Sequence, residues 1–327
     1  MSLLLLDRAQ LEIRLDGEAL ALYESGTRRG TVPAKLIDRC VIHGAATRLD
    51  TGVLLKLADA GATTVLMSPR QPRRVALVLG PQHNDAAVRL AQAQHVFDPA
   101  ACATWAAALV RAKLKRQLRT LRLWQAQRPD ARKPIFDAIS RVQAGLDTIG
   151  PTSDTARLRG LEGAAARSYF AAMAAVMPPA LGFAGRKRRP PPDPVNVGLS
   201  LSYTLAHLQA VAACQAAGLD PLLGFYHRPA IGRESLASDL IEPLRPAIDA
   251  WLWGLLRDRT LRDDHFSLDK GACILGKAGR SLYYARWEAD SAPWRRWLRA
   301  QTRALAAELR ERGSAWLAPL DDEDEHL

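Results

Sequence analysis

The hydrophobic pattern of this 327-residue chain changes its period near Gly80 and Pro81. Before this point apolar and polar residues alternate, as at Leu11, Ile13 and Leu15, which is the two-residue period of a half-buried strand. After it, apolar residues recur every three or four positions, which is the period of an amphipathic helix. The sequence therefore predicts an α+β protein with a small β-rich, sandwich-like N-terminal domain and a larger all-α C-terminal domain.

Turn signals divide the N-terminal domain, residues 1–80, into several short strands. Asp16–Gly17 is a typical hairpin-turn dipeptide, and runs rich in β-branched or apolar residues follow at 40–42, 63–67 and 75–79. Residues 50–60 instead carry apolar side chains at helical spacing and predict one short helix. Short strands with frequent turns favour a small sandwich or a curled sheet.

Helix start and stop signals divide the rest of the chain. We expect a linker with an introductory helix over 81–99, a helical domain over 100–320 and an acidic tail over 321–327. Asp193 and Pro194 form an N-cap followed by proline at the first helical position, and Gly218 is a stop signal, so one helix should span this segment. The next helix should begin at Ser235 or Ser238 and reach about residue 256, and Pro243 should kink it or require a helix to begin near Glu242. Further helices are predicted over 100–127 and 155–175.

Composition excludes several classes of protein. With 48% hydrophobic and 24% charged residues, the chain resembles an ordinary globular protein rather than a disordered one. No uninterrupted apolar run approaches the roughly 20 residues that a membrane span needs, and no signal-peptide core is present, so we expect a cytoplasmic protein without a membrane partner. The four cysteines form no CxxC pair, which argues against zinc ribbons and disulfide frameworks.

The charge of the chain is strongly basic. Its formal net charge is +11, and without the five acidic residues at 321–325 the remaining chain carries +16. Most of the basic residues are arginines, whose planar guanidinium pairs with phosphate through two hydrogen bonds. Two explanations remain equally open: a polyanionic partner such as nucleic acid, or a biased base composition that favours Ala and Arg codons.

Three acids and one histidine have apolar neighbours. Glu162 lies among alanines, His227 ends an apolar loop, and Asp239 and Glu242 are three residues apart, which places both on one face of a helix. Each has an ordinary alternative, such as a helix-dipole partner, an ion pair of Glu242 with Arg245, or a satisfied core histidine. Together, two or three carboxylates and an imidazole suit Mg²⁺ or Mn²⁺ better than zinc.

Several segments, in the proper order, resemble the signatures of the CRISPR-associated integrase family, whose members insert spacers in bacterial adaptive immunity. The segment at 158–170 contains Glu162, and the third signature, at 218–246, contains His227, Asp239 and Glu242. The matching motifs are VP at 32–33, VIHG at 41–44, Arg89 and Gln92, LRGLEG at 158–163, DPVN at 193–196, YTL at 203–205, GLDP at 218–221, GFYH at 224–227 and DLIEP at 239–243. The resemblance covers nearly the whole chain and is most specific at 227–245.

This resemblance implies a metal site made by Glu162, His227 and Glu242, with Asp239 close by, and Mg²⁺ or Mn²⁺ as the cofactor. It also implies a homodimer joined largely through the β-rich domains, and a larger assembly with DNA and the small second CRISPR adaptation protein. The implied reaction is transesterification, in which a 3′-hydroxyl of a foreign DNA fragment attacks a phosphodiester at the repeat boundary. Members of the family also cleave branched DNA.

The same resemblance, together with the charge, suggests which residues contact DNA. Arg245 lies one helical turn after Glu242, where it is placed to hold a phosphate beside the metal. The basic run at 186–189 is either a loop that follows the DNA backbone or an ordinary solvated charge run. Tyr203 either stacks on DNA ends or packs in the core. The remaining candidates are Arg186, Lys187, Arg188, Arg189, Lys277, Arg280, Asn196 and Tyr203.

Two other functions stay open at the level of sequence. One is a structure-specific nuclease that acts on branched DNA in repair without a dedicated partner. The other is a catalytically silent DNA-binding scaffold, which is disfavoured because all four ligand positions hold competent side chains. The same site would serve an integrase or a nuclease, so the residues alone do not separate these two.

Overall fold

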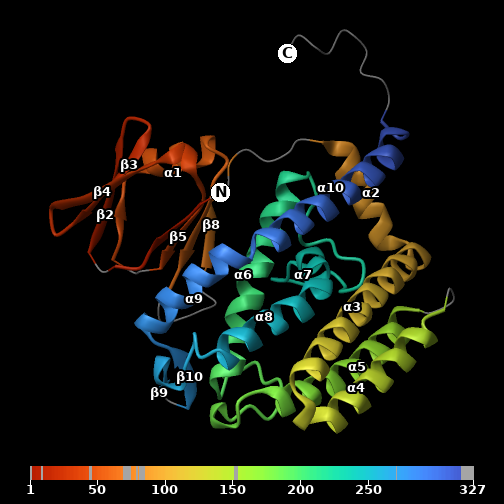
Figure 1. Ribbon diagram of the computed structural model, residues 1–327. Helices are drawn as coiled ribbons and strands as arrows, with labels where there is room; N and C mark the ends of the chain where they lie inside the picture. The colour runs from red at the N-terminus through yellow and green to blue at the C-terminus, as the bar shows by residue number, and fades with distance from the viewer. Residues whose placement is uncertain are drawn as a thin grey trace. The chain divides into compact units, whose positions relative to one another are not determined.

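The chain folds into two compact units in a computed structural model that describes residues 2–8, 10–43, 46–68, 75–78, 80, 85–150, 154–269 and 271–317 (Figure 1). Unit 1 comprises Met1–His83 with Trp287–Asp290, and unit 2 comprises Asn84–Arg286 with Ser291–Leu327. The acidic run at 321–325 lies outside the described residues. The change of hydrophobic period therefore coincides with the division of the chain into units.

Unit 1 is built from two four-stranded sheets and one short helix. The first sheet has the order β1-β5-β7-β8, with β1, β5 and β7 parallel and β8 antiparallel to β7. The second has the order β4-β3-β2-β6, an antiparallel meander with β6 added parallel to β2. The elements are β1 (Ser2–Leu6), β2 (Leu11–Asp16), β3 (Ala19–Glu24), β4 (Thr27–Pro33), β5 (Ile37–His43), β6 (Arg48–Leu49), α1 (Thr51–Asp59), β7 (Thr63–Met67) and β8 (Val75–Val78).

Both sheets of unit 1 contribute to one apolar core. Ile13 and Leu20 from the second sheet pack with Cys40 and Ile42 from the first, and Leu57 of α1 joins them. The alternation at 11–15 explains part of this arrangement, since Leu11 and Ile13 of β2 point into the core, whereas Leu15 is 41% exposed. The sandwich-like N-terminal domain is confirmed.

Unit 2 is mostly helical. Helices α3, α4 and α5 pack side by side, and α6 packs against α7, α8 and α10 (Figure 1). Its helices are α2 (Ala86–Phe97), α3 (Pro99–Gln127), α4 (Arg132–Thr148), α5 (Thr155–Val176), α6 (Pro194–Ala216), α7 (Ser235–Ile241), α8 (Arg245–Arg257), α9 (Lys277–Asp290, shared with unit 1) and α10 (Ala292–Ser314). The β-rich part followed by a larger helical part confirms the predicted fold class.

Two details of unit 2 modify the predicted order of helices, and the second of them was expected from Pro243. The domain is not purely α-helical, because β9 (Phe266–Asp269) and β10 (Ala272–Leu275) form an antiparallel hairpin. The helix expected from Ser235 or Ser238 to about residue 256 is interrupted by a 3-10 turn, η4 (Glu242–Leu244), between α7 and α8. Pro243 causes this break, because it has no N–H for the helical ladder and its ring disfavours a continuous helix.

The predicted ends of α6 are confirmed, whereas the predicted N-cap of α7 is wrong. Asp193 caps α6 as predicted, with its side chain accepting a hydrogen bond from the Asn196 N–H at 2.8 Å. Gly218 follows the end of this helix with a φ of +83°, a left-handed conformation that favours glycine. Neither Ser235 nor Ser238 caps α7, since the residue before its first turn is Glu234 and no side-chain cap is formed.

Helix α6 has the length and the apolar composition of a membrane span, with a mean hydropathy of 1.3 over its most apolar window. More than half of that window is buried inside the protein, and the helix contacts α7, α8 and α10. A central helix of a globular core passes the same test of length and composition. Packing within unit 2 thus covers more than half of this apolar window.

Candidate functional site

A cavity of about 140 Å³ in unit 2 brings together the three residues predicted to form the metal site. Glu162 comes from α5, His227 from the loop before α7, and Glu242 from η4. Helix α3 contributes Lys113 to the same cavity. Lys113 and Glu242, which are 129 positions apart in the chain, thus share one small polar space.

The break between α7 and α8 positions Glu242. Residue 242 begins the 3-10 turn, and Pro243 follows it, so the chain changes direction where the carboxylate enters the cavity. The Nε of Arg245 donates to Glu242 Oε1 at 3.0 Å. The ion pair that the sequence offered as an ordinary explanation for Glu242 is therefore present, but it lies inside the cavity rather than on a solvated helix face.

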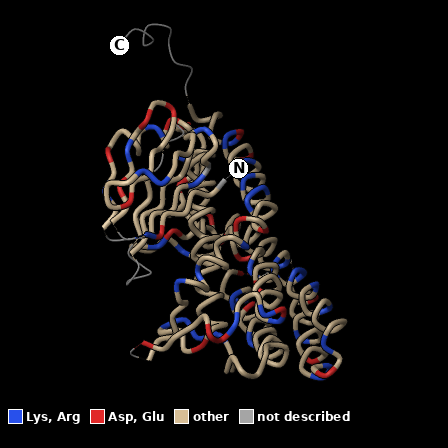
Figure 2. The backbone as a smooth tube through the Cα atoms, turned by 60° about the vertical axis from the view of Figure 1, so that its left-hand side comes forward, with Lys and Arg blue, Asp and Glu red and all other residues tan. Residues whose placement is uncertain are grey.

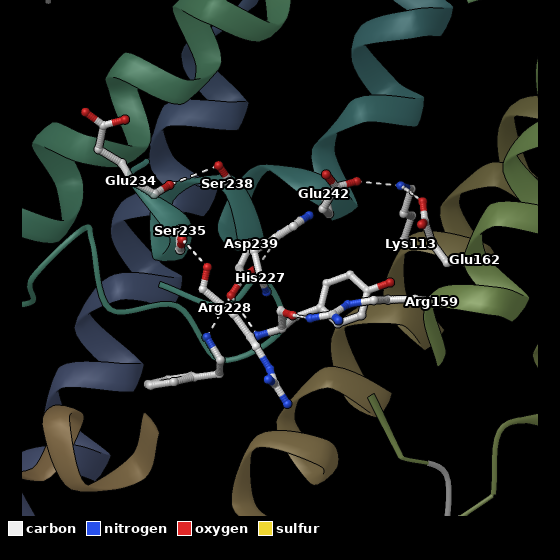
Figure 3. A network of polar contacts seen from close by, with 12 residues as sticks. Lys113, Arg159, Glu162, His227, Arg228, Glu234, Ser235, Ser238, Asp239 and Glu242 are labelled. Carbon is white, nitrogen blue, oxygen red and sulfur yellow. Dashed lines mark hydrogen bonds and ion pairs between the residues drawn. The ribbon is translucent and has the colours of Figure 1, made fainter. Parts of the chain in front are cut away.

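Lys113 occupies the space between the two carboxylates. Its Nζ donates hydrogen bonds to Glu162 Oε1 and to Glu242 Oε2 (Figure 3). Burial alone would raise the pKa of Glu242, but the positive charges of Arg245 and Lys113 outweigh it and lower this pKa to about 2. Burial likewise lowers the pKa of Lys113, and the two carboxylates outweigh this and raise it. Glu242 and Lys113 are therefore both charged at neutral pH.

Asp239 lies behind His227 and does not line the cavity. Its carboxylate accepts the backbone N–H groups of Phe225, Tyr226 and His227 at 2.9, 3.0 and 2.9 Å, and it is 2.6 Å from His227 Nδ1 (Figure 3). A Cβ at Gly224 would come within 2.6 Å of the Ser235 backbone, so only glycine permits this tight loop. Asp239, expected as a fourth ligand, is instead placed to orient the imidazole.

Further contacts hold this loop from outside. Arg159 donates to the Tyr226 carbonyl at 2.8 Å, and its guanidinium lies over the Tyr226 ring. Gln92 of α2 donates to the carbonyls of Asp220 and Leu223 at 2.8 and 3.0 Å. Both residues occur in the motifs of the resemblance, and the structure gives them a positioning role.

Asp249 also lines the cavity, although the sequence did not mark it as a site residue. Asp249 of α8 accepts a hydrogen bond from the Tyr169 hydroxyl at 3.0 Å and another from the Tyr203 hydroxyl. Burial raises the pKa of Asp249 to about 6, although the hydrogen bonds from the tyrosines act in the opposite direction. The spacing of Glu242, Arg245 and Asp249 could have indicated this residue, because positions three and seven residues apart lie on one face of a helix.

The predicted DNA-binding residues divide into two groups. Arg186, Arg188, Arg245 and Tyr203 line the cavity, and the Arg245 guanidinium lies 4.3 Å from the centre of the Tyr203 ring. Tyr203 is also buried and anchored to Asp249, so it forms part of the wall. Outside this cavity lie Lys187, Arg189, Asn196, Lys277 and Arg280.

Asn196 holds the basic loop against the start of α6. Its side-chain oxygen accepts from Arg186 Nη1 at 2.9 Å and from the Lys187 N–H at 2.8 Å. Its amide nitrogen donates to the Gly185 carbonyl at 2.9 Å and to Asp193 at 2.7 Å. All its hydrogen-bonding groups are used within the protein, so it positions the loop rather than reading DNA.

The donor set of the cavity fits a hard divalent cation. Among the described side chains no three carboxylate, imidazole or thiol groups converge closely enough to enclose an ion in their present positions. The ammonium of Lys113 lies where Glu162 and Glu242 meet, however, so these two carboxylates already share one cation. With Nδ1 of His227 directed at Asp239, Nε2 is the nitrogen left to act as a ligand.

The sequence as a whole is similar to those of known proteins. Residues 4–289 match the family described as "CRISPR associated protein Cas1". The CRISPR-associated endonuclease Cas1 1 of Thermodesulfovibrio yellowstonii is 35% identical over 297 residues, which cover 88% of this chain and 91% of that protein.

Solved structures share the fold at lower sequence identity. A casposase bound to its integration product superposes with a TM-score of 0.82 at 21% identity and covers all of this chain and 94% of its own. The Cas1-containing chain of a Cas6-RT-Cas1–Cas2 complex gives a TM-score of 0.77 at 21% identity, with 95% of this chain but 35% of that longer chain covered.

Proposed function

Because the chain belongs to the CRISPR-associated Cas1 family, we propose that it is a metal-dependent DNA integrase and endonuclease that inserts foreign DNA fragments into a CRISPR array. The convergence of Glu162, His227 and Glu242 on one cavity bordered by arginines carries this proposal. The name endonuclease of the T. yellowstonii relative supports nuclease chemistry. The integration product bound by the casposase supports strand joining.

The reaction is a transesterification. The 3′ oxygen of the incoming fragment forms a bond to phosphorus at the repeat boundary, and the bond from that phosphorus to the 3′ oxygen of the cut strand breaks. One phosphodiester replaces another, so neither an oxidant nor an external energy source is required. In-line alignment and charge neutralisation are what such a transfer needs from the protein.

The residues of the cavity supply these two requirements. Glu162, Glu242 and His227 Nε2 would hold Mg²⁺ or Mn²⁺, which polarises a phosphoryl oxygen and stabilises charge on the 3′ oxygens. Asp239 fixes the direction of the imidazole. Arg245, Arg186 and Arg188 line the same cavity and offer bidentate hydrogen bonds to the phosphate oxygens of DNA.

The partners follow from the same family membership. We propose a homodimer formed through unit 1, acting in the cytoplasm on fragment ends, CRISPR repeats and branched DNA. The Cas6-RT-Cas1–Cas2 complex supports Cas2 as the small second adaptation protein that completes the assembly. Lys and Arg are distributed along the chain (Figure 2), and the net charge of +11 favours a DNA ligand.

Strand transfer of labelled 3′-hydroxyl DNA into a repeat-bearing plasmid tests the proposal. Wild type, Glu162→Ala and Glu242→Ala would be compared with and without Mg²⁺, Mn²⁺ and Cas2, with Glu311→Ala at an exposed position of α10 as the matched control. We expect either cavity variant to lose at least about 100-fold in rate, with DNA affinity changed by less than about threefold.

The other outcomes distinguish the alternative functions. Cleavage of branched DNA without any joining, even with Cas2 present, would identify a structure-specific nuclease. Tight DNA binding with neither activity would leave a scaffold and contradict the catalytic proposal.

A further inference from the structure

Lys113 is a buried cation between the two carboxylates of the proposed metal site. It projects from the middle of α3, it is 7% exposed, and its ammonium donates to both Glu162 and Glu242. A buried lysine is rare unless it is paired, because removing an ammonium from water is costly. Here one ammonium is paired with two carboxylates that, in the proposed function, hold the divalent ion.

The charges of this cluster already balance. Glu162 and Glu242 carry two negative charges, and Lys113 and Arg245 carry two positive charges within hydrogen-bond distance of them. Adding a divalent ion between the same carboxylates would leave an excess of two positive charges in a small, partly buried space, where like charges repel strongly. One cation must leave the carboxylates when the metal arrives.

Lys113 is the cation that can move. Arg245 is fixed by its hydrogen bond to Glu242 at 3.0 Å and by its stacking at 4.3 Å on the Tyr203 ring. The ammonium of Lys113 is a compact charge on a flexible four-carbon stem, and Glu162 and Glu242 are the partners that hold it. Its side chain lines the cavity, so it can turn toward a DNA phosphate without a change of the backbone.

We propose that Lys113 is a displaceable counter-cation that competes with the divalent ion for Glu162 and Glu242. The inference rests on the proposed function, because it takes these carboxylates as metal ligands. In the DNA-free protein the ammonium neutralises the site and weakens metal binding. When a phosphodiester enters, its negative charge gives the ammonium a new partner, so metal and DNA occupy the site together.

Mn²⁺ affinity of the DNA-free protein tests this competition without any activity assay. Free Mn²⁺ would be measured by electron paramagnetic resonance at pH 8 during titration of wild type, Lys113→Met and Lys115→Met. Lys115 is on the same helix but exposed, so its variant removes a lysine without touching the carboxylates. We expect Lys113→Met to bind Mn²⁺ at least tenfold more tightly than wild type, and Lys115→Met to match wild type.

Other results of the Mn²⁺ titration would distinguish a failure of this inference from a failure of the proposed function. Equal or weaker Mn²⁺ binding by Lys113→Met, with measurable binding by wild type, overturns the competition and leaves the metal site intact. Absence of Mn²⁺ binding in both proteins overturns the metal site as well. Should Lys113→Met not fold, crystals of the wild type with and without Mn²⁺ decide: the ammonium should leave both carboxylates in the Mn²⁺ form, and its persistence between them contradicts the proposal.

Discussion

At the scale of single residues, Asp249 shows how burial changes the chemistry of a carboxyl group. Its pKa is about 6 against an ordinary value of 3.8, because burial favours the protonated form. Between these two pH values the unfolded chain has lost this proton while the folded chain keeps it. The free energy of unfolding therefore falls by about 3 kcal/mol as the pH rises from below 3.8 to above 6.

Asp249→Asn removes this titration while keeping groups that can pair with Tyr169 and Tyr203. The unfolding free energy of the variant relative to wild type should rise by about 3 kcal/mol between pH 3.5 and pH 7. Urea unfolding across this range measures the difference. The control is Asp137→Asn, at an exposed position of α4, whose unfolding free energy should vary with pH as that of wild type does. If the unfolding free energy of Asp249→Asn also varied with pH as that of wild type does, burial would not perturb Asp249.

At the scale of elements, the start of α6 and the basic loop before it act together. Asn196 joins them through four hydrogen bonds, to Arg186, Lys187, Gly185 and Asp193. Arg186 and the neighbouring Arg188 of this loop line the cavity. The start of α6 thus helps to position the basic residues of the loop.

Asn196→Ala should release the loop and weaken DNA binding about three- to tenfold, because freed arginines lose entropy when they bind phosphate. Fluorescence anisotropy with a labelled branched DNA measures the affinity, and Mn²⁺ binding should stay at the wild-type value. Lys277→Ala, outside the cavity, is the comparison. An equal or smaller loss for Asn196→Ala than for Lys277→Ala would contradict the positioning role.

At the scale of the whole molecule, the proposed assembly begins with a homodimer. Sedimentation velocity at micromolar concentration should give a species of about 72 kDa, twice the 35.8 kDa chain. Unit 1 exposes the apolar residues Leu36 and Leu55, at 56% and 66%. Replacing both by Glu should raise the dimer dissociation constant at least about tenfold, because apolar contacts dominate stable interfaces.

The control for this prediction is Phe136→Glu, at a similarly exposed position of α4 in unit 2. It should leave the mass unchanged. A species of about 36 kDa at every concentration of wild type would contradict the dimer. Loss of the dimer in Phe136→Glu alone would show that the interface lies in unit 2.

The sequence by itself determined the features that depend on neighbouring residues. Alternation at 11–15 indicated strands, the Asp193 cap and Gly218 bounded α6, and ordered motifs identified the family and its candidate ligands. These signals are local, since periodicity and capping involve residues within about four positions. The hairpin at 266–275, with four residues in each strand, was not predicted.

Only the tertiary structure decided what meets in the cavity. It placed Lys113 of α3 between Glu162 and Glu242, turned Asp239 from an expected ligand into the support of His227, and buried Asp249 among tyrosines. No local pattern encodes these contacts, because they join helices that are distant in the chain and are fixed by packing. The sequence determined which chemical groups the protein has, and the packing of its helices decided which of them face one another.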